Sequence, residues 1–312
     1  WRATTAMAAV PAVLQFAMLL CLPESPRWLV TKGKLQEARE ALAALRDDDD
    51  DSVLAEELRK VEDIVREEQA TPVGNPWLAT VRTLPRRRAL SVGVAIMVFQ
   101  ALTGINAVMY YGSSIARGVG FSHRTSVWIA AIFDVAQLLG VVVSIQRMDH
   151  AGRRPLAMSS ALGCVVSLLA MILFSTSLFP TEGVLSATMV YLFVFGSGYS
   201  GVAWTLNSEV HPLATRSHAQ SIAVAANWGA NAVVSVFFKP VQTTHGAAVA
   251  FSPFLLLTGL GLVWMFFCLP ETKGVSLEDL ERRFQQRGSA KSRRASSSSR
   301  RASSSSRRAS SS

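Results

Sequence analysis

The sequence predicts an all-α integral membrane protein with about seven transmembrane helices. Half of the 312 residues are hydrophobic, and only 17% are charged. Apolar runs of about 20 residues, the length that a helix needs to cross a bilayer, recur along the chain, and basic residues gather in alternate connections between them. The runs cover 4–22, 89–111, 125–146, 156–179, 185–206, 218–238 and 247–269.

The distribution of basic residues predicts the orientation of these spans. The segment 23–88, the loop 147–154 and the C-terminal tail are rich in Lys and Arg, whereas 112–124, 180–184 and 239–246 hold few. By the positive-inside rule we expect 23–88, 147–154, 207–217 and the tail to be cytoplasmic. The first run has no starter Met and ends in a charged motif, so it does not resemble a cleaved signal peptide. Because the chain opens on Trp1, we expect further sequence upstream. The predicted orientation requires that this upstream sequence hold an odd number of spans.

Four segments follow from this pattern. Residues 1–22 form the first span, and 23–88 form a cytoplasmic linker in which 34–46 and 52–70 have the spacing of short amphipathic helices. The other six spans occupy 89–269. The cytoplasmic tail, 270–312, is expected to be disordered from about residue 288, where a basic, Ser-rich repeat begins.

The tail also accounts for the net charge of +9. From Arg282 onward there are ten Lys or Arg and no acid, so the rest of the chain is nearly neutral, and we expect no nucleic-acid partner. Ser296, Ser303 and Ser310 each follow Arg-Arg-Ala, which makes them candidate sites for basophilic kinases. Drift of a low-complexity sequence is the alternative.

Polar residues stand where leucine would be expected in the run FQALTGINAVMYY (99–111). On a continuous helix Gln100, Thr103, Asn106, Tyr110 and Tyr111 fall within one arc of about 140°. Such groups serve either as contacts between helices or as the lining of a polar cavity. A face this wide favours the cavity, and the neighbouring glycine at 104 would let the helix bend.

Other spans supply matching groups. Amides bind pairs of hydroxyls, and indole rings pack on the apolar face of a sugar ring, so a polyhydroxylated ligand is indicated. Asp134 is an ionisable group in an apolar run, which is a functional candidate unless it lies near the outer end in water. GSGYSG (196–201) is glycine-rich enough to weaken its helix. The remaining polar and aromatic positions are Gln137, Trp204, Asn207, Asn227, Trp228 and Asn231.

Catalytic and metal-binding patterns do not occur in the sequence. There is no His-Glu-x-x-His motif, no metal-spaced Cys/His set and no nucleophile elbow, so we expect neither an enzyme nor a metal or cofactor site. Ser208, Glu209 and His211 are close in sequence but stand at a helix end. The three cysteines, which are Cys21, Cys164 and Cys268, are expected to be buried thiols.

Four ordered motifs resemble the signatures of the sugar porter family of the major facilitator superfamily. They are LPESPRWLV (22–30), QALTGINAVMYY (100–111), DHAGRRP (149–155) and LPETKGVSLEDLE (269–281). The resemblance covers about residues 1–285. It implies a major-facilitator-type helical bundle, of which this chain holds helix six, the cytoplasmic linker and the six-helix C-terminal half.

The resemblance also implies a mechanism and roles for residues. Substrate would bind near the bilayer midplane between two six-helix halves that rock to expose it to either side. The substrate-binding positions that the motifs imply are Gln100, Asn106, Gln137, Trp204, Asn227 and Trp228, with Tyr110 and Tyr111 as the outer gate. The implied cytoplasmic charge network comprises Asp149, Arg153, Arg154, Glu209 and Arg216, joined from the other half by Glu24 and Arg27. Surface charges that only set the orientation are the alternative.

The sequence departs from the family pattern at two places. Ala101 stands where the family usually has a second glutamine, and GSGYSGVAW lacks the usual proline before its tryptophan. AWTLNSEVHPL (203–213) is more similar to the inositol branch than to the hexose facilitators. We therefore expect transport of a monosaccharide or myo-inositol, in the plasma membrane or, alternatively, an organellar one. A non-transporting sugar sensor and an inert truncated product are the rival hypotheses.

Two partners follow from the resemblance besides the lipid bilayer and the substrate. The missing N-terminal half must supply the other wall of the cavity. A co-transported proton is expected if the chain belongs to a symporter, and the family's coupling acid usually lies on helix one, which this sequence does not include.

Overall fold

The computed structural model describes residues 2–45, 51–70, 75–176, 178–212 and 215–275. Every regular element in these ranges is a helix, so the all-α fold is confirmed. The chain divides into two compact units, Trp1–Val73 and Gly74–Ser312, and each is described by itself. The candidate phosphorylation sites Ser296, Ser303 and Ser310, and the whole repeat from residue 288, lie outside the described residues.

The described residues of the first unit form five helices: α1 (Arg2–Met7), α2 (Ala9–Leu19), α3 (Pro26–Thr31), α4 (Leu35–Ala44) and α5 (Asp51–Ala70). The first apolar run thus forms two short helices. Pro11 gives a reason for the interruption, because it has no N–H to donate to the carbonyl of Met7 one turn earlier. No residue of α2 is buried within this unit, and its exposed side chains are mostly apolar. The helices α3 and α4 meet at a small core of Leu29, Ala38 and Ala41.

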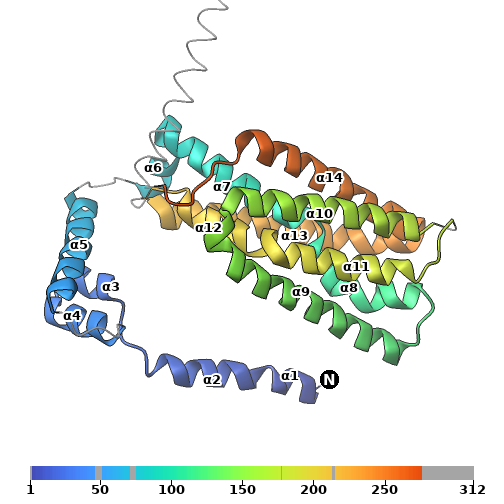
Figure 1. Ribbon diagram of the computed structural model, residues 1–312, viewed down its shortest axis with the longest axis horizontal. Coiled ribbons are helices and arrows are strands. Elements are labelled where there is room, and N and C mark those ends of the chain that lie inside the picture. Colours follow the sequence, from blue (N-terminus) through green and yellow to red (C-terminus); the bar gives the residue numbers. More distant parts are fainter. Residues whose placement is uncertain (1, 46–50, 71–74, 177, 213–214, 276–312) are drawn as a thin grey trace, which may run out of the picture. The chain divides into compact units, whose positions relative to one another are not determined.

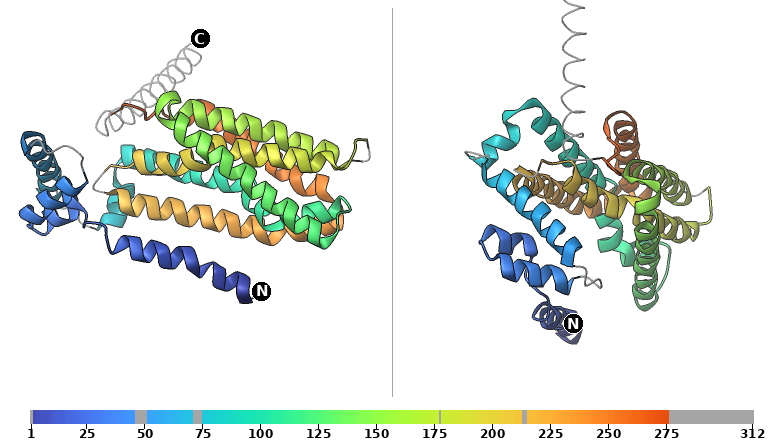
Figure 2. Two further views of the ribbon diagram at one scale, coloured as in Figure 1. Left: turned by 60° about the horizontal axis from the view of Figure 1, so that its bottom comes forward. Right: turned by 60° about the vertical axis from the view of Figure 1, so that its left-hand side comes forward.

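The second unit contains six helical segments that are long and apolar enough to cross a membrane, out of the residues described. After the short α6 (Pro76–Arg82), they lie side by side as a bundle (Figures 1 and 2). The segments are α7 (Leu84–Leu102) with α8 (Ile105–Gly118), α9 (His123–Ala151), α10 (Arg153–Phe174), α11 (Gly183–Phe195) with the π-helical turn η1 (Gly196–Ser200) and α12 (Gly201–Glu209), α13 (Arg216–His245), and α14 (Ala247–Cys268). The sequence predicted seven spans. Six of them correspond to these segments, whereas the first, 4–22, does not form a single helix long enough to cross a membrane.

The bundle is held by close contacts between particular helices. α7 packs along α13, while α10 packs on both α11 and α14. α9 approaches the α11–η1 segment at two glycines, where a Cβ on Gly140 would lie 2.2 Å from the carbonyl oxygen of Phe193. Small residues that let backbones touch are the usual basis of helix association in lipid.

The two ends of the bundle have different chemistry. The end at which α7, α10 and α13 begin carries the loops expected to be cytoplasmic, and we call it the inner end. The opposite end is called the outer end.

The cysteine prediction is confirmed for Cys164, which is buried, but it is wrong for Cys21 and Cys268, which are exposed. Both stand near helix ends, where no described residue of their own unit buries them.

Candidate functional site

The polar run 99–111 spans a break in the first long helical segment. α7 ends at Leu102, and α8 begins at Ile105 after Gly104, whose φ of 83° lies in the left-handed region. A Cβ on Gly104 would meet the ring of Phe254 at 2.4–2.8 Å, so both the backbone and the packing require glycine here. The carbonyl of Thr103 at the break accepts a hydrogen bond from the buried hydroxyl of Tyr191 at 2.9 Å.

The break changes the expected arrangement of the polar face. Because α8 starts afresh, the continuous arc predicted for residues 100–111 does not apply across residue 104. Thr103 is fully buried, and its hydroxyl donates to the carbonyl of Gln100 at 2.7 Å. The N-cap residue of α8, Gly104, offers no side-chain acceptor to the backbone N–H groups of the first turn.

The glycine-rich segment 196–201 distorts its helix without breaking it. Gly196–Ser200 forms a π-helical turn, a feature frequent at functional sites. Ser160 of α10 inserts beside the turn: its hydroxyl accepts from the N–H of Tyr199 at 2.9 Å and donates to the carbonyl of Val194 at 2.7 Å. The expected weakening therefore takes the form of a π turn that a neighbouring helix stabilises.

Four amide side chains form one hydrogen-bonded row across α7, α8 and α13. Asn227 lies at its centre and donates from Nδ2 to Gln100 Oε1 at 2.8 Å and to the carbonyl of Met97 at 2.7 Å. Asn231, one turn later, donates to Asn227 Oδ1 at 3.1 Å. Asn106 completes the row by donating from Nδ2 to Asn231 Oδ1. The row thus joins both sides of the helix break to α13.

Both ends of this amide row keep hydrogen-bonding capacity. Among the described residues, neither Asn106 Oδ1 nor Gln100 Nε2 has a partner, so the row offers one acceptor oxygen at one end and one amide NH2 group at the other. Gln137 on α9, which is not part of the row, has a buried acceptor of its own, because its Oε1 has no hydrogen bond in the described part of the chain. A neutral ligand with several hydroxyls has the donors and acceptors that would complete these groups.

The predicted aromatic residues lie mostly at the surface of the second unit. Trp204, Trp228 and Tyr110 are 44%, 56% and 59% exposed, which is high for indole and phenol rings. Tyr111 instead stacks on Phe238 with ring centroids 5.4 Å apart, and its hydroxyl donates to the carbonyl of Ser235 at 3.2 Å. Asp134 is exposed as well.

An ion-paired cluster occupies the inner end. Arg153, which begins α10, donates from Nε and Nη2 to Glu209 Oε1 at 3.2 and 3.0 Å. Its Nη1 lies 3.9 Å from Asp149, so that contact is weak beside the pair with Glu209. The hydroxyl of Thr272 donates to the other oxygen of Glu209. Arg216 donates to the carbonyl of His211 at 3.3 Å.

Glu271, which the sequence did not single out, closes the turn between α9 and α10. Its carboxylate accepts the backbone N–H groups of Arg153 and Arg154 at 3.0 and 3.1 Å, and it lies so close to Gly152 that a Cβ there would be 2.8 Å from Oε2. Partial burial raises the pKa of Glu271, but backbone hydrogen bonds from four residues outweigh it and leave the pKa below its usual value. The side chain of Arg154 donates to the carbonyl of Phe266. The motif at 269–281 is the signal that could have predicted this carboxylate.

His211 lies beside this cluster as a neutral ring. It is 1% exposed and packs on Gly93 of α7, where a Cβ would lie 2.6 Å from Nε2. Burial lowers the pKa of His211 to about 4, and the positive charge of Arg216 acts in the same direction. Nε2 is 3.2 Å from Asn207 Oδ1. These contacts make His211 part of the helix packing, in line with the low weight that the sequence gave it as a catalytic group.

The other predicted residues are spread over the chain. Glu24 and Arg27 belong to the first unit, and their expected link to the inner-end cluster stays a prediction. Asn231 was noticed only as part of a cluster, although its spacing of four from Asn227 places both on one face of α13. Ser160 and Tyr191 were missed, because nothing in sequence distinguishes them from other Ser and Tyr residues in apolar runs.

The fold and the site together define a multi-pass membrane protein with a polar, uncharged site inside its bundle and ion pairs at one end. A profile described as "Sugar (and other) transporter" matches residues 1–284, so the chain belongs to this family. Members of the family are transporters and not enzymes, in agreement with the expectation from the sequence.

Individual relatives agree with this assignment. The chain is 32% identical over 295 residues to the major myo-inositol transporter IolT of Bacillus subtilis (strain 168), with 91% of the chain and 60% of the relative covered. It is 28% identical over 382 residues to the human proton myo-inositol cotransporter, with 92% and 58% covered. A solved structure of the proton:xylose symporter XylE, bound to 6-bromo-6-deoxy-D-glucose, matches with 29% identity and a TM-score of 0.76 over 91% of this chain and 59% of that chain. The chain therefore spans about three fifths of the length of these relatives.

Proposed function

We propose that the chain is the C-terminal portion of a carrier that moves a monosaccharide or cyclitol, such as myo-inositol, across a membrane by alternating access. The observation that carries this proposal is the amide row of Gln100, Asn227, Asn231 and Asn106 with one free acceptor and one free donor at its ends. Its groups are neutral, and the row crosses a helix break, a feature that transporters use to present backbone groups to a substrate.

The substrate class is supported by the chemistry of the row and by the names of relatives. The amides bind hydroxyl pairs without requiring charge, and the exposed rings of Trp204 and Trp228 supply apolar faces. Two matched relatives are named for myo-inositol and one structure for xylose. A proton is proposed as the co-transported ion, since relatives of both substrate classes carry it in their names.

Uptake of labelled myo-inositol, xylose and glucose tests this function in cells that lack their own carriers. The chain is expressed alone and together with the N-terminal portion of a related carrier, with and without a pH gradient. Uptake only in the complemented cells, increased by the gradient, is the expected result. If the complemented chain inserts in the membrane but neither binds nor moves any of the three, the proposal is wrong. A fluorescent fusion in the same cells tests the proposed plasma-membrane location against an organellar one.

Removing the ends of the amide row should weaken substrate binding. Gln100→Ala and Asn106→Ala each remove a group that would bond a substrate hydroxyl, so we expect about a tenfold rise in the concentration for half-maximal uptake. Gln146→Ala, which truncates an exposed amide at the inner end of α9, is the matched control and should leave uptake unchanged. Loss of folded protein in Gln100→Ala and Asn106→Ala but not in Gln146→Ala, measured on membranes by immunoblot, would mean that the row only holds helices together.

The inner-end cluster is proposed to stabilise one conformation of the cycle. Arg153→Ala removes the pair with Glu209, so substrate exchange should slow by about tenfold while equilibrium binding changes less than about threefold. Arg147→Ala removes an exposed arginine from the end of α9 and serves as the control. Unchanged exchange in Arg153→Ala would reduce the cluster to surface charges that set the orientation.

A further inference from the structure

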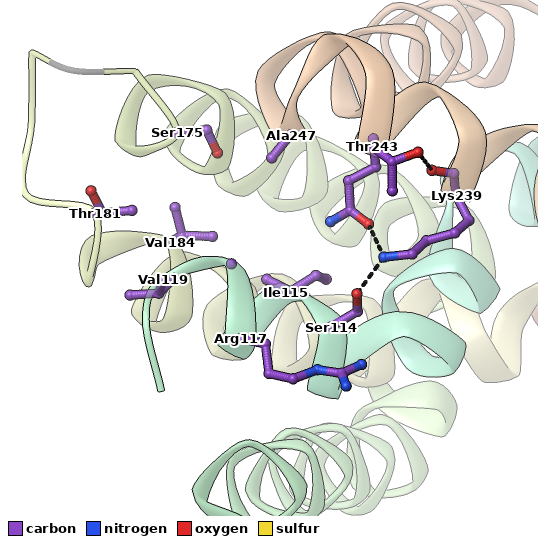
Figure 3. A pocket seen from close by; sticks show the side chains of 12 residues that line it. Ser114, Ile115, Arg117, Val119, Ser175, Thr181, Val184, Lys239, Thr243 and Ala247 are labelled. Atoms are coloured by element: carbon purple, nitrogen blue, oxygen red, sulfur yellow. Dashed lines mark hydrogen bonds between the residues drawn. The ribbon is translucent and has the colours of Figure 1, made fainter. Parts of the chain in front are cut away.

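A cavity with several polar side chains lies at the outer end of the bundle, and no residue of the amide row lines it. Its volume is about 490 Å³, and it is formed where α8, α10, α11, α13 and α14 begin or end (Figure 3). The side chains that matter for its chemistry are Ser114, Arg117, Lys239, Gln242 and, on the far side, Ser175 and Thr181. None of the described residues that line it is acidic.

Lys239 is the central charge of this cavity. It lies on α13, partly buried, and its Nζ points to Ser114 Oγ and to Gln242 Oε1, the second at 3.3 Å (Figure 3). The ring of Tyr111 is 5.9 Å from Nζ. All of these partners are neutral, and within the described ranges no carboxylate forms an ion pair with Lys239. An ammonium group near the end of a membrane helix that lacks a counter-charge is a favourable place for an anion.

Other donors surround the ammonium group. Gln242 accepts through Oε1, which leaves its amide N–H groups available, and the hydroxyl of Ser114 keeps its own proton. Ala247, the first residue of the 22-residue helix α14, lines the cavity, and no side-chain cap covers that helix start. The positive end of a helix dipole therefore adds to the charge of Lys239. Arg117 lies at the rim, exposed, and no ion pair holds its side chain in the described part of the chain.

We propose that this cavity binds a phosphate group, with Lys239 as its main contact and Ser114, Gln242 and the start of α14 as additional donors. A phosphate oxygen accepts from ammonium, hydroxyl, amide and backbone N–H groups alike. The cavity is lined by side chains with the first three kinds of donor and by the first residue of α14. The proposed phosphate site is separate from the amide row, because no residue of that row lines the cavity.

The location of the cavity indicates two sources for the phosphate. It lies where membrane helices end, which is the depth of lipid headgroups, so the phosphodiester of an outer-leaflet lipid can reach it. A free phosphate ester from the outer solution would present the same chemistry. Both sources require Lys239, and they differ in whether an acyl chain is needed.

Direct binding to the purified full chain tests the proposal independently of transport. Free phosphate is represented by inorganic phosphate and glycerol 3-phosphate in titrations followed by ³¹P NMR. Lipid is represented by nanodiscs of phosphatidylglycerol or phosphatidylcholine, with retained lipid counted by native mass spectrometry. We expect Lys239→Met to weaken binding by at least about tenfold, and Lys239→Arg to keep most of it. Arg124→Gln, a loss of the same charge at the outer start of α9 outside the cavity, should have no effect.

The outcomes separate the sources and can overturn the site. Lys239-dependent binding of glycerol 3-phosphate assigns a free ester, whereas Lys239-dependent retention of lipid alone assigns a headgroup. If Lys239→Met does not fold, Gln242→Leu keeps the cation and removes two donors, and it should weaken binding by about threefold. No binding in either arm by the folded chain, equal loss in Arg124→Gln, or equal displacement by neutral myo-inositol would each refute the phosphate site. Because the readout is binding, a failed transport assay leaves this result intact.

Discussion

Two long helical segments of the second unit are interrupted, and the interruptions differ in kind. Between α7 and α8 the helix stops at Thr103 and Gly104 and starts again, with glycine in a left-handed conformation. Between α11 and α12 the helix continues through the π turn η1. Each is completed by one hydroxyl from another helix: Tyr191 at the break and Ser160 at the π turn.

The difference lies in what holds each interruption in place. At the break, the hydrogen bond from Tyr191, the ring of Phe254 and the amide row hold the junction between α7 and α8. At the π turn the backbone hydrogen bonds continue, and Ser160 ties the turn to α10 on two sides. The amide row starts at the break, so a movement of α8 changes the distance between Gln100 and Asn106.

The largest expected effect is that of Gly104→Ala. The new Cβ would lie 2.4 Å from a ring atom of Phe254, and alanine is disfavoured at the φ of 83°. We expect a loss of about 3 kcal/mol or more, seen as reduced folded protein in the membrane and a lower Tm in detergent. Gly118→Ala, where nothing lies within 4 Å, is the control in the same helix. Adding Phe254→Leu should restore part of the loss, because the clash is relieved and the backbone strain is not. A Gly104→Ala chain as stable as the wild type would contradict a fixed break.

Ser160→Ala should have the next largest effect and acts on the π turn alone. It removes the acceptor that the Ser160 hydroxyl offers to the buried N–H of Tyr199, so we expect a loss of about 1–3 kcal/mol. Val194 loses less, since its carbonyl still accepts from Ser197 at 2.8 Å. Ser167→Ala is the matched control: Ser167 lies on the same helix, is 4% exposed against 3% for Ser160, and bonds only its own helix at Gly163. Equal melting temperatures for the two variants would mean that the π turn does not depend on Ser160.

Gly104 and Ser160 also show which part of the site could be predicted from the sequence. Gln100, Asn106 and Asn227 stand out because an amide in an apolar run requires a partner, and Gly104 was recognised as a place where the helix could bend. Ser160 and Ser167 cannot be told apart in sequence, because a serine hydroxyl inside a helix is readily satisfied by the carbonyl one turn earlier. Only the packing of α10 against η1 decides that Ser160 bonds a different helix.

The same limit applies to the charged residues. The motifs predicted Arg153 and Glu209, and the structure pairs them at 3.0 Å. Glu271, in contrast, is 118 residues after Arg153 in the sequence, yet its carboxylate accepts the backbone N–H of Arg153. A contact that depends on how α14 returns to the start of α10 cannot be inferred from local spacing. The fold class followed from the length of the apolar runs, whereas the division of the first run at Ala8 depends on a single proline.

The smallest expected effect distinguishes two buried tyrosines of the same segment. Tyr191 and Tyr199 are 0% and 1% exposed, but only the hydroxyl of Tyr191 has a partner, the carbonyl of Thr103, whereas that of Tyr199 is buried without one in the described structure. Tyr191→Phe should therefore lower the unfolding free energy by about 1–2 kcal/mol, and Tyr199→Phe should leave it unchanged or raise it, because an unsatisfied hydroxyl is removed.

Thermal unfolding of both variants in one detergent measures this difference, and substrate binding adds a second readout. If Tyr191 holds the break, Tyr191→Phe should also change the affinity for the substrate, since the carbonyl that it releases lies between Gln100 and Asn106. Tyr199→Phe should not. A similar loss of stability in both variants would mean that the hydroxyl at the break contributes no more than ring packing, and α7 and α8 would then be held by Phe254 and the amide row alone.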